Sequence, residues 1–292
     1  MPDRSVLRRW PAVLGMRVIT SLIVLICAGF LATALVRLAP GFGIDERSLD
    51  MPYGSSADQQ PDAHPGVVSS YADFLLRATR GDFGQSVTFA RPVSELVAER
   101  AGFTVQSALT GFFGAWCLAL ALSLGSRLRR GRFLEVLGEG GSSTLLCVPS
   151  AVVAFLVVSS GLSVYAGIAV VVFPRAFRFS NALLTQSAKE AYVSGARARG
   201  ISEIRVLCNH VLREAAPHLI TLAGVTLPVA FGAAIPMEVL CDAPGLGQLA
   251  WRGALGRDLP LVVTISLLIA AVTLISNTAA RAAADCMAAE VR

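Results

Sequence analysis

Histidines, cysteines and other side chains that most often bind metals or attack substrates do not occur in this sequence at the spacings of known metal or catalytic motifs. Three histidines, His64, His210 and His218, lack the spacing of metal ligands. No phosphate-binding loop, nucleophile elbow or zinc signature is present. Six cysteines form no Cys-x-x-Cys pair and mostly lie in or beside apolar runs, which predicts small buried side chains: Cys27, Cys117, Cys147, Cys208, Cys241 and Cys286. We therefore expect no catalytic residue, no metal site and no cofactor, and we do not expect the chain to be an enzyme.

A run of small side chains offers a different kind of chemistry, the docking of another protein. Gly200, a residue suited to a helix C-terminus, follows the small residues Ser194, Gly195, Ala196 and Ala198. Ser202 and Glu203 can then start a second helix. A short helix, a glycine turn and a second helix running to Arg213 would form a rigid knob, whose backbone a partner could approach closely. An ordinary amphipathic loop is the alternative. The candidate docking residues are Ser194, Gly195, Ala196, Arg197, Ala198, Arg199, Gly200 and Ile201.

The composition indicates that lipid surrounds the elements that position this knob. Of the 292 residues, 54% are hydrophobic and only 15% are charged, whereas soluble domains carry about a quarter charged residues. The mean hydropathy is +0.63. The formal net charge is +5, but the arginines flank apolar runs, which is typical of membrane proteins rather than of proteins that bind nucleic acid.

Apolar runs of about 20 residues predict an all-α, polytopic membrane protein with about six transmembrane helices. The expected spans are 14–38, 103–126, 143–160, 162–181, 216–238 and 261–284. The first run is too long for a signal peptide and is read as a retained span. Only Ser159-Ser160-Gly161 separates the third span from the fourth, so one long span is an alternative there. It would reverse the orientation of everything downstream.

The distribution of arginines favours six spans with both termini in the cytoplasm. The acid-rich segment 39–102 is then outside, with an amphipathic helix at 67–80 and a short helix at 92–100 that has Pro92 in its first turn. Segment 182–215, which contains the knob, is inside. Arg175 and Arg178 are expected near the inner end of the fourth span, where they can reach the interface.

The outer end of the fifth span holds the second set of candidate residues. Glu238, Pro244, Gly245 and Gly247 could line a translocation path or form an outer gate. A solvated or paired acid and a structural glycine turn are the alternatives. Pro217 is expected at the start of the fifth span. Each of Pro149, Pro174 and Pro236 either kinks a helix or ends one.

Several motifs, in order along the chain, resemble the permeases of ATP-binding-cassette importers, in the branch that includes the dipeptide, oligopeptide and nickel permeases. Tyr192-Val193-Ser194-Gly195-Ala196-Arg197-Ala198-Arg199-Gly200 is similar to the branch's coupling loop, and His210-Val211-Leu212-Arg213 follows in the branch's usual form. The other matching segments are 38–41, 80–86, 91–96 with Glu99, Arg100 and Thr104, Glu238 with 244–249, and 257–262. The single N-terminal span and the 80–86 motif resemble the first of the family's two paired permeases.

The resemblance implies a single permease domain over 1–292 with the type I importer fold, in a bacterial inner membrane. Its implied partners are a second permease subunit, ATP-binding cassette subunits, an extracytoplasmic solute-binding protein and membrane lipid. The implied solute is a peptide or a similar small molecule. The chain departs from the family in the short connection between spans three and four and in its ending Asp285-Cys286-Met287-Ala288-Ala289-Glu290-Val291-Arg292. A secondary transporter and a membrane-embedded enzyme are the rival classes, but no acid lies mid-span to serve either.

Overall fold

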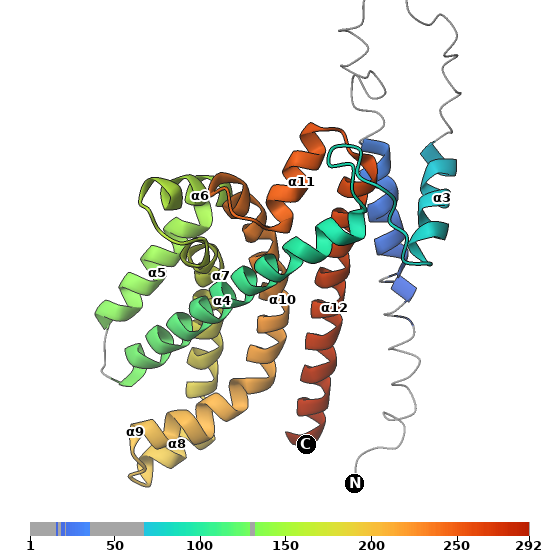
Figure 1. The fold of residues 1–292 in the computed structure, drawn as a ribbon. Helices are drawn as coiled ribbons and strands as arrows, with labels where there is room; N and C mark the ends of the chain where they lie inside the picture. Colours follow the sequence, from blue (N-terminus) through green and yellow to red (C-terminus); the bar gives the residue numbers. More distant parts are fainter. Residues whose placement is uncertain (1–15, 17–18, 21, 36–66, 129–131, 292) are drawn as a thin grey trace, which may run out of the picture. The chain divides into compact units, whose positions relative to one another are not determined.

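The computed structural model describes residues 16, 19–20, 22–35, 67–128 and 132–291 (Figure 1). Every regular element in these residues is helical, and the single isolated bridge joins Gln85 and Pro92. The chain divides into two units. The first holds residues 101–248 and 271–292 together with the N-terminal residues, and the second holds 18–100 and 249–270. Each unit is described by itself.

Among the residues that the structure describes, four helices are long and apolar enough to cross a membrane: Val93–Arg127, Val164–Ala188, Glu203–Leu240 and Leu259–Ala283. They correspond to the predicted second, fourth, fifth and sixth spans. A shorter apolar helix, Leu22–Leu35, lies within the predicted first span, and the rest of that span is mostly outside the described residues. The prediction of an all-α polytopic membrane protein is confirmed.

The predicted third span is not one straight helix. Helix α5 (Arg132–Cys147) and helix α6 (Ser150–Ser159) meet at a bend of 105°. Pro149 lies directly before α6, and a proline has no N–H with which to continue the preceding helix. Of its two readings, Pro149 therefore ends a helix. Counting this pair as one broken span gives up to five in the described residues.

Two other helix boundaries differ from those predicted. The short helix expected at 92–100 is not separate, because α4 (Val93–Leu128) runs without a break into the second span. Pro217 does not begin the fifth span either. Helix α9 (Glu203–Val206) continues through a π-helical turn (Leu207–Val211) into α10 (Leu212–Leu240), which contains Pro217, Pro228 and Pro236.

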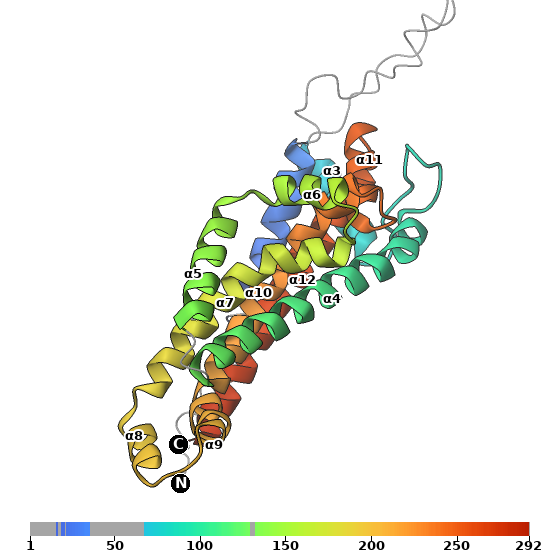
Figure 2. The same cartoon turned by 90° about the vertical axis from the view of Figure 1, so that its left-hand side faces the viewer.

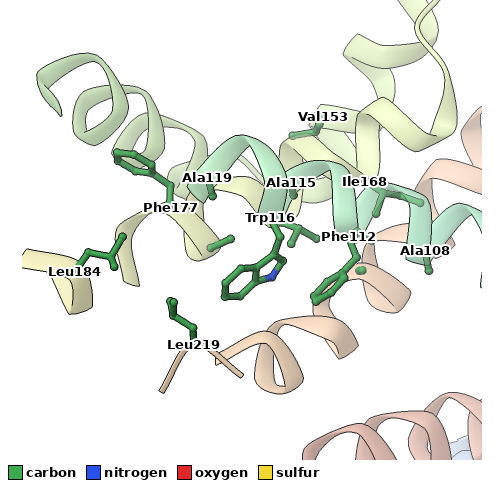
Figure 3. Close-up of a cluster of buried hydrophobic side chains, with 14 of the residues drawn as sticks. Ala108, Phe112, Ala115, Trp116, Ala119, Val153, Ile168, Phe177, Leu184 and Leu219 are labelled. Carbon is green, nitrogen blue, oxygen red and sulfur yellow. The ribbon is translucent and has the colours of Figure 1, made fainter. Parts of the chain in front are cut away.

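The core of the first unit is built mainly by α4, α6, α7 (Val164–Ala188) and α10 (Figure 3). Phe112, Trp116 and Ile168 are among its buried side chains, and the Trp116 indole N–H donates a hydrogen bond to the Thr226 hydroxyl over 3.1 Å. Helices α7 and α10 pack along each other, and α5 packs on α7 (Figure 2). The cysteines do not fit the prediction of burial, since Cys27, Cys117, Cys147 and Cys208 are exposed and Cys241 is half-buried. A free thiol behaves as a small hydrophobic side chain with only a weak donor, so its exposure on an apolar helix costs little in a membrane protein.

The second unit contains the predicted amphipathic helix, which is observed as α3 (Val67–Ala78). Its buried face carries Tyr71 and Phe74, and the Tyr71 hydroxyl donates to the Ile26 carbonyl over 2.8 Å. The end of α11 (Leu246–Leu255) and the beginning of α12 (Leu259–Val291) belong to the same unit. Between them, the buried Asp258 carboxylate accepts hydrogen bonds from the Ser86 hydroxyl and the Thr88 N–H, which ties the motif at 80–86 to the start of the last span.

Candidate functional site: the 191–206 knob and the 238–247 turn

The predicted knob consists of helix α8 (Ala191–Ala198), a glycine turn and α9 (Figure 1). Gly200 has a φ of +75°, a conformation that costs glycine little and other residues more. The Gly200 N–H bonds to the Arg197 carbonyl over 2.9 Å, and the Ile201 N–H bonds to the Ala196 carbonyl over 3.4 Å. These two bonds make a Schellman cap, which ends α8 and turns the chain into α9. The expectation of a short helix, a glycine turn and a second helix that begins near Glu203 is confirmed, but the second helix does not end at Arg213 and continues into α10.

The knob is anchored on its inner side by apolar packing. Val193 and Ala196 on α8 are fully buried in the same cluster as Val206, Leu207 and Val211. Apolar residues three apart lie on one side of a helix, so the sequence of α8 directs this face inward. The knob is therefore packed against the helix that leads into α10 and is not a loose loop.

Most of the candidate docking residues lie on the open side of the knob. Ala196 is buried and Ile201 is half-buried, but six of the eight are exposed: Ser194, Gly195, Arg197, Ala198, Arg199 and Gly200. A Cβ added at Gly195 or at Gly200 would meet no atom within 4 Å. The knob thus presents backbone and small side chains that another protein can approach closely.

An ion pair closes the glycine turn on the outside. The Arg197 Nε donates to Glu203 Oε1 over 3.0 Å, and Arg197 Nη2 donates to Oε2 over 3.3 Å. Both side chains are about half exposed, so the pair contributes little to stability. Glu203 was expected only as a helix start, although the six-residue separation across a tight turn permits this pairing.

A second contact that the sequence did not indicate joins α8 to the π-helical turn. The rings of Tyr192 and His210 stack with their centroids 6.4 Å apart. The Leu212 N–H bonds to the Leu207 carbonyl, five residues earlier, and this wider turn is the reason for the π assignment. Such turns within α-helices occur frequently at functional sites.

Arg127 fixes the end of α7 that leads into the knob. One of its terminal nitrogens donates to the Asn181 carbonyl, to the Asn181 side-chain oxygen and to the Thr185 hydroxyl over 2.7–2.9 Å. Asn181 in turn donates to Glu139 on α5 over 3.3 Å. Nothing in the sequence around Arg127 reveals these partners on other helices.

The second candidate set forms a closed turn at the far end of α10. Glu238 is fully buried, and its Oε2 accepts the Gly247 N–H over 2.7 Å, while the Ser107 hydroxyl lies 3.5 Å from Oε1. The Leu246 N–H bonds to the Thr104 hydroxyl over 2.8 Å. The structure thus brings Glu238 together with the backbone of the turn. Its carboxylate accepts hydrogen bonds from buried donors that would otherwise have no partner.

The two glycines of this turn have no room for a side chain. A Cβ on Gly245 would collide with the Glu238 carboxylate, and a Cβ on Gly247 would come within 2.9 Å of Glu238 Oε2. Pro244, between Ala243 and Gly245, is exposed. In the described residues no group of three or more His, Cys, Asp or Glu side chains could hold a metal ion. Whether this turn gates a path stays a prediction.

Comparison with known families identifies the chain. Residues 117–292, more than half of the chain, match the family described as "Binding-protein-dependent transport system inner membrane component". The chain belongs to this family. The matched part includes both the 191–206 knob and the 238–247 turn, so both candidate sites of the permease lie in the region that matches the family.

Relatives of the permease match over most of its length. The oligopeptide transport system permease protein OppB of Escherichia coli (strain K12) is 25% identical over 275 residues, which cover 87% of this chain and 89% of OppB. The glutathione transport system permease protein GsiC of Salmonella typhimurium is 26% identical over 211 residues, covering 65% and 68%. The metal-staphylopine import system permease protein CntB of Staphylococcus aureus (strain NCTC 8325) is 25% identical over 239 residues, covering 73% and 74%.

These comparisons confirm the resemblance found in the sequence and favour an importer permease over a secondary transporter. The permease is the inner-membrane component of a bacterial transport system, and the family describes a transport component rather than a catalytic subunit. The roles of individual residues in the knob and in the 238–247 turn remain predictions.

Proposed function

We propose that the chain is the first of two paired permease subunits in an ATP-driven importer of peptides or similar small solutes. Relatives named for oligopeptides, glutathione and a metal chelate support the solute class. In this proposal an extracytoplasmic solute-binding protein delivers the solute, and ATP-binding subunits supply the energy.

The observation that carries the proposal is the construction of the 191–206 knob. Its buried face is fixed to the helix that continues into α10, while its exposed face presents Gly195, Gly200 and small side chains with open space around them. A partner seated on that face can push a rigid body, and the continuous helix from Glu203 to Leu240 carries the displacement into the membrane.

The two states of such a machine differ in how the ATP-binding subunits hold the knob. ATP can favour one arrangement of the spans only through contacts that differ between the states. The ion pair of Arg197 with Glu203 and the Schellman cap at Gly200 stiffen the knob, so motion of the partner is not lost in bending of the turn.

Reconstitution into lipid vesicles tests the proposal. The complex assembled with its second permease, its ATP-binding subunits and its binding protein should take up a labelled tripeptide only when ATP is supplied. The permease alone, in the same vesicles under a proton or sodium gradient, should show no uptake. Gradient-driven uptake by the permease alone would contradict the proposal and would restore the secondary transporter.

A further inference from the structure

The 191–206 knob is joined to two different spans. Helix α7 ends at Ala188, shortly before α8 begins at Ala191, so α7 leads directly into the knob (Figure 2). At the other end of the knob, α9 continues through the π-helical turn into α10. A partner that moves the knob can therefore displace α7, α10 or both, and the contacts of these two helices decide which of them follows.

The knob-side end of α7 is held by α4. The Arg127 guanidinium donates to the Asn181 carbonyl over 2.8 Å, to the Asn181 side-chain oxygen over 2.9 Å and to the Thr185 hydroxyl over 2.7 Å. The fully buried hydroxyls of Ser123 and Ser180, 3.4 Å apart, join the same two helices. Hydrogen bonds from an ionised donor are stronger than those between neutral groups. Because Thr185 lies in the last turn of α7, this anchor is next to the knob.

Helix α5 holds the same part of α7. The Asn181 side-chain nitrogen donates to Glu139 Oε1 over 3.3 Å. The backbone of α5 also comes so near the buried Phe177 ring that a Cβ on Gly138 would collide with it. Asn181 thus links the Arg127 guanidinium on α4 to a carboxylate on α5. The knob-side half of α7 is therefore packed and hydrogen-bonded against two other helices.

The helix that leaves the knob is built differently, because it can bend at two points close to the knob. The first is the π-helical turn, Leu207–Val211. The second is Pro217 inside α10, which has no N–H to bond to the carbonyl four residues before it. Sharp bends in helices occur mostly at such π-turns and at prolines. A force on the knob can therefore change the tilt of α10 while α7 stays with α4 and α5.

We propose that Arg127 is a positioning residue for transport, which makes α7 the fixed end of the knob so that displacement of the knob enters α10. This inference rests on the proposed function. Arg127 acts through α7 and needs to touch neither the solute nor ATP. When its hydrogen bonds are lost, α7 follows the knob, and part of each displacement no longer changes the tilt of α10. ATP is then hydrolysed with less transport.

The number of solute molecules taken up per ATP hydrolysed measures this role. In vesicles that contain the complete complex, Arg127→Gln should still allow assembly and ATP hydrolysis. The uptake of a labelled tripeptide per ATP should fall about tenfold, the factor by which losing a hydrogen bond from a charged group shifts an equilibrium between two states. Arg127→Lys keeps a charged nitrogen with three N–H donors and should retain most of the ratio.

Milder variants and a charge control accompany this measurement. Thr185→Val removes one acceptor of Arg127 at nearly constant shape and should lower the uptake per ATP by a smaller factor, whereas Thr185→Ser keeps the hydroxyl and should not. Arg178→Gln removes the same charge from an exposed position on α7 and should leave the ratio unchanged. A purely structural role of Arg127 would instead lower the amount of complex, so uptake and hydrolysis would fall together.

A disulfide can replace the anchor. Because the Ser123 and Ser180 hydroxyls lie 3.4 Å apart, cysteines at both positions are placed to join α4 to α7. Oxidation with copper phenanthroline should leave uptake by the complex intact, since α4 and α7 stay together during the cycle. In Arg127→Gln the same disulfide should restore the uptake per ATP, and reduction should remove the gain. Ser123→Cys alone, oxidised in the same way, controls for the native cysteines.

Three results would overturn the inference. They are an unchanged uptake per ATP in Arg127→Gln, a disulfide that stops uptake when Arg127 is present, and a disulfide that fails to restore the ratio in Arg127→Gln. The second result would show that α4 and α7 separate during transport. Failure of the proposed function is distinguishable from all three, because the complex with its native sequence would then show no ATP-dependent uptake of the tripeptide.

Discussion

Two glycine turns of the permease, one at Gly200 and one at Gly245–Gly247, use the same residue for opposite reasons. Gly200 has a positive φ and open space where a side chain would stand. Gly245 is enclosed, because the Glu238 carboxylate occupies the place of a Cβ. Gly200 is needed for its backbone conformation at an exposed turn, whereas Gly245 is needed because a buried carboxylate leaves no room for a side chain. Substitutions should therefore separate binding from folding.

The largest loss of stability is expected at the closed turn. Gly245→Val forces two methyl groups into the space of the Glu238 carboxylate, and overpacking of this kind costs about 1–3 kcal/mol or more. The amount of protein in the membrane and the midpoint of thermal unfolding in detergent should both fall. Gly195→Val, on the open face of the knob, is the control and should leave both unchanged. Equal losses of stability for Gly245→Val and Gly195→Val would contradict the conclusion that one site is enclosed and the other open.

The carboxylate of Glu238 should matter as a hydrogen-bond acceptor. Glu238→Ala leaves the buried Gly247 N–H without its acceptor, at a cost of about 1–3 kcal/mol, whereas Glu238→Gln keeps an oxygen there and should cost less. Thermal unfolding of the purified protein measures both. Because Glu238→Ala also makes room at Gly245, its combination with Gly245→Ala should cost less than the sum of the two single changes. Additive costs would show that the carboxylate does not fill this space.

Replacing Gly200, which has a positive φ, should lower the stability of the protein by a moderate amount. Gly200→Ala places a Cβ at positive φ without touching a neighbour and should cost about 1 kcal/mol. Gly161, in the turn between α6 and α7, has a φ of +65° and the same open surroundings. Gly161→Ala should therefore cost a similar amount in thermal unfolding. A much larger cost at Gly200 would mean that the knob needs this glycine for packing as well.

The smallest effect is expected for the ion pair across the knob. Arg197 and Glu203 are both about half exposed, and exposed pairs contribute at most about 1 kcal/mol. Arg197→Gln should leave the unfolding midpoint nearly unchanged at 150 mM salt. A large shift would show that the knob depends on this pair for its fold.

The sequence was sufficient for the parts of the fold that depend on local pattern. Apolar runs predicted the long helices, and small residues followed by Gly200 predicted a helix that ends in a turn, since glycine is the residue for which positive φ costs least. Motif order also led to the family, which the match over residues 117–292 confirms. These signals lie in residues that are neighbours along the chain.

The contacts that the sequence missed join residues far apart in the chain. Nothing near Arg127 in sequence points to Asn181 and Thr185, and nothing near Asp258 points to Ser86. Apolar composition alone also failed at Val148-Pro149, because an apolar run does not reveal that it is bent by 105°. Pro149 was predicted either to kink or to end a helix, so the break could be foreseen from the sequence but its angle could not.

Docking of the ATP-binding subunit on the knob is the central claim, and a pair of matched variants measures it most directly. Gly200→Asp and Gly161→Asp add the same charged side chain at glycines of similar positive φ in open space, a conformation that aspartate tolerates better than most residues. Both variants should reach wild-type levels in the membrane. Gly161→Asp should retain the ATP-binding subunits through purification of the complex, and Gly200→Asp should lose them together with transport. Retention of the ATP-binding subunits by Gly200→Asp, with normal transport, would contradict the account.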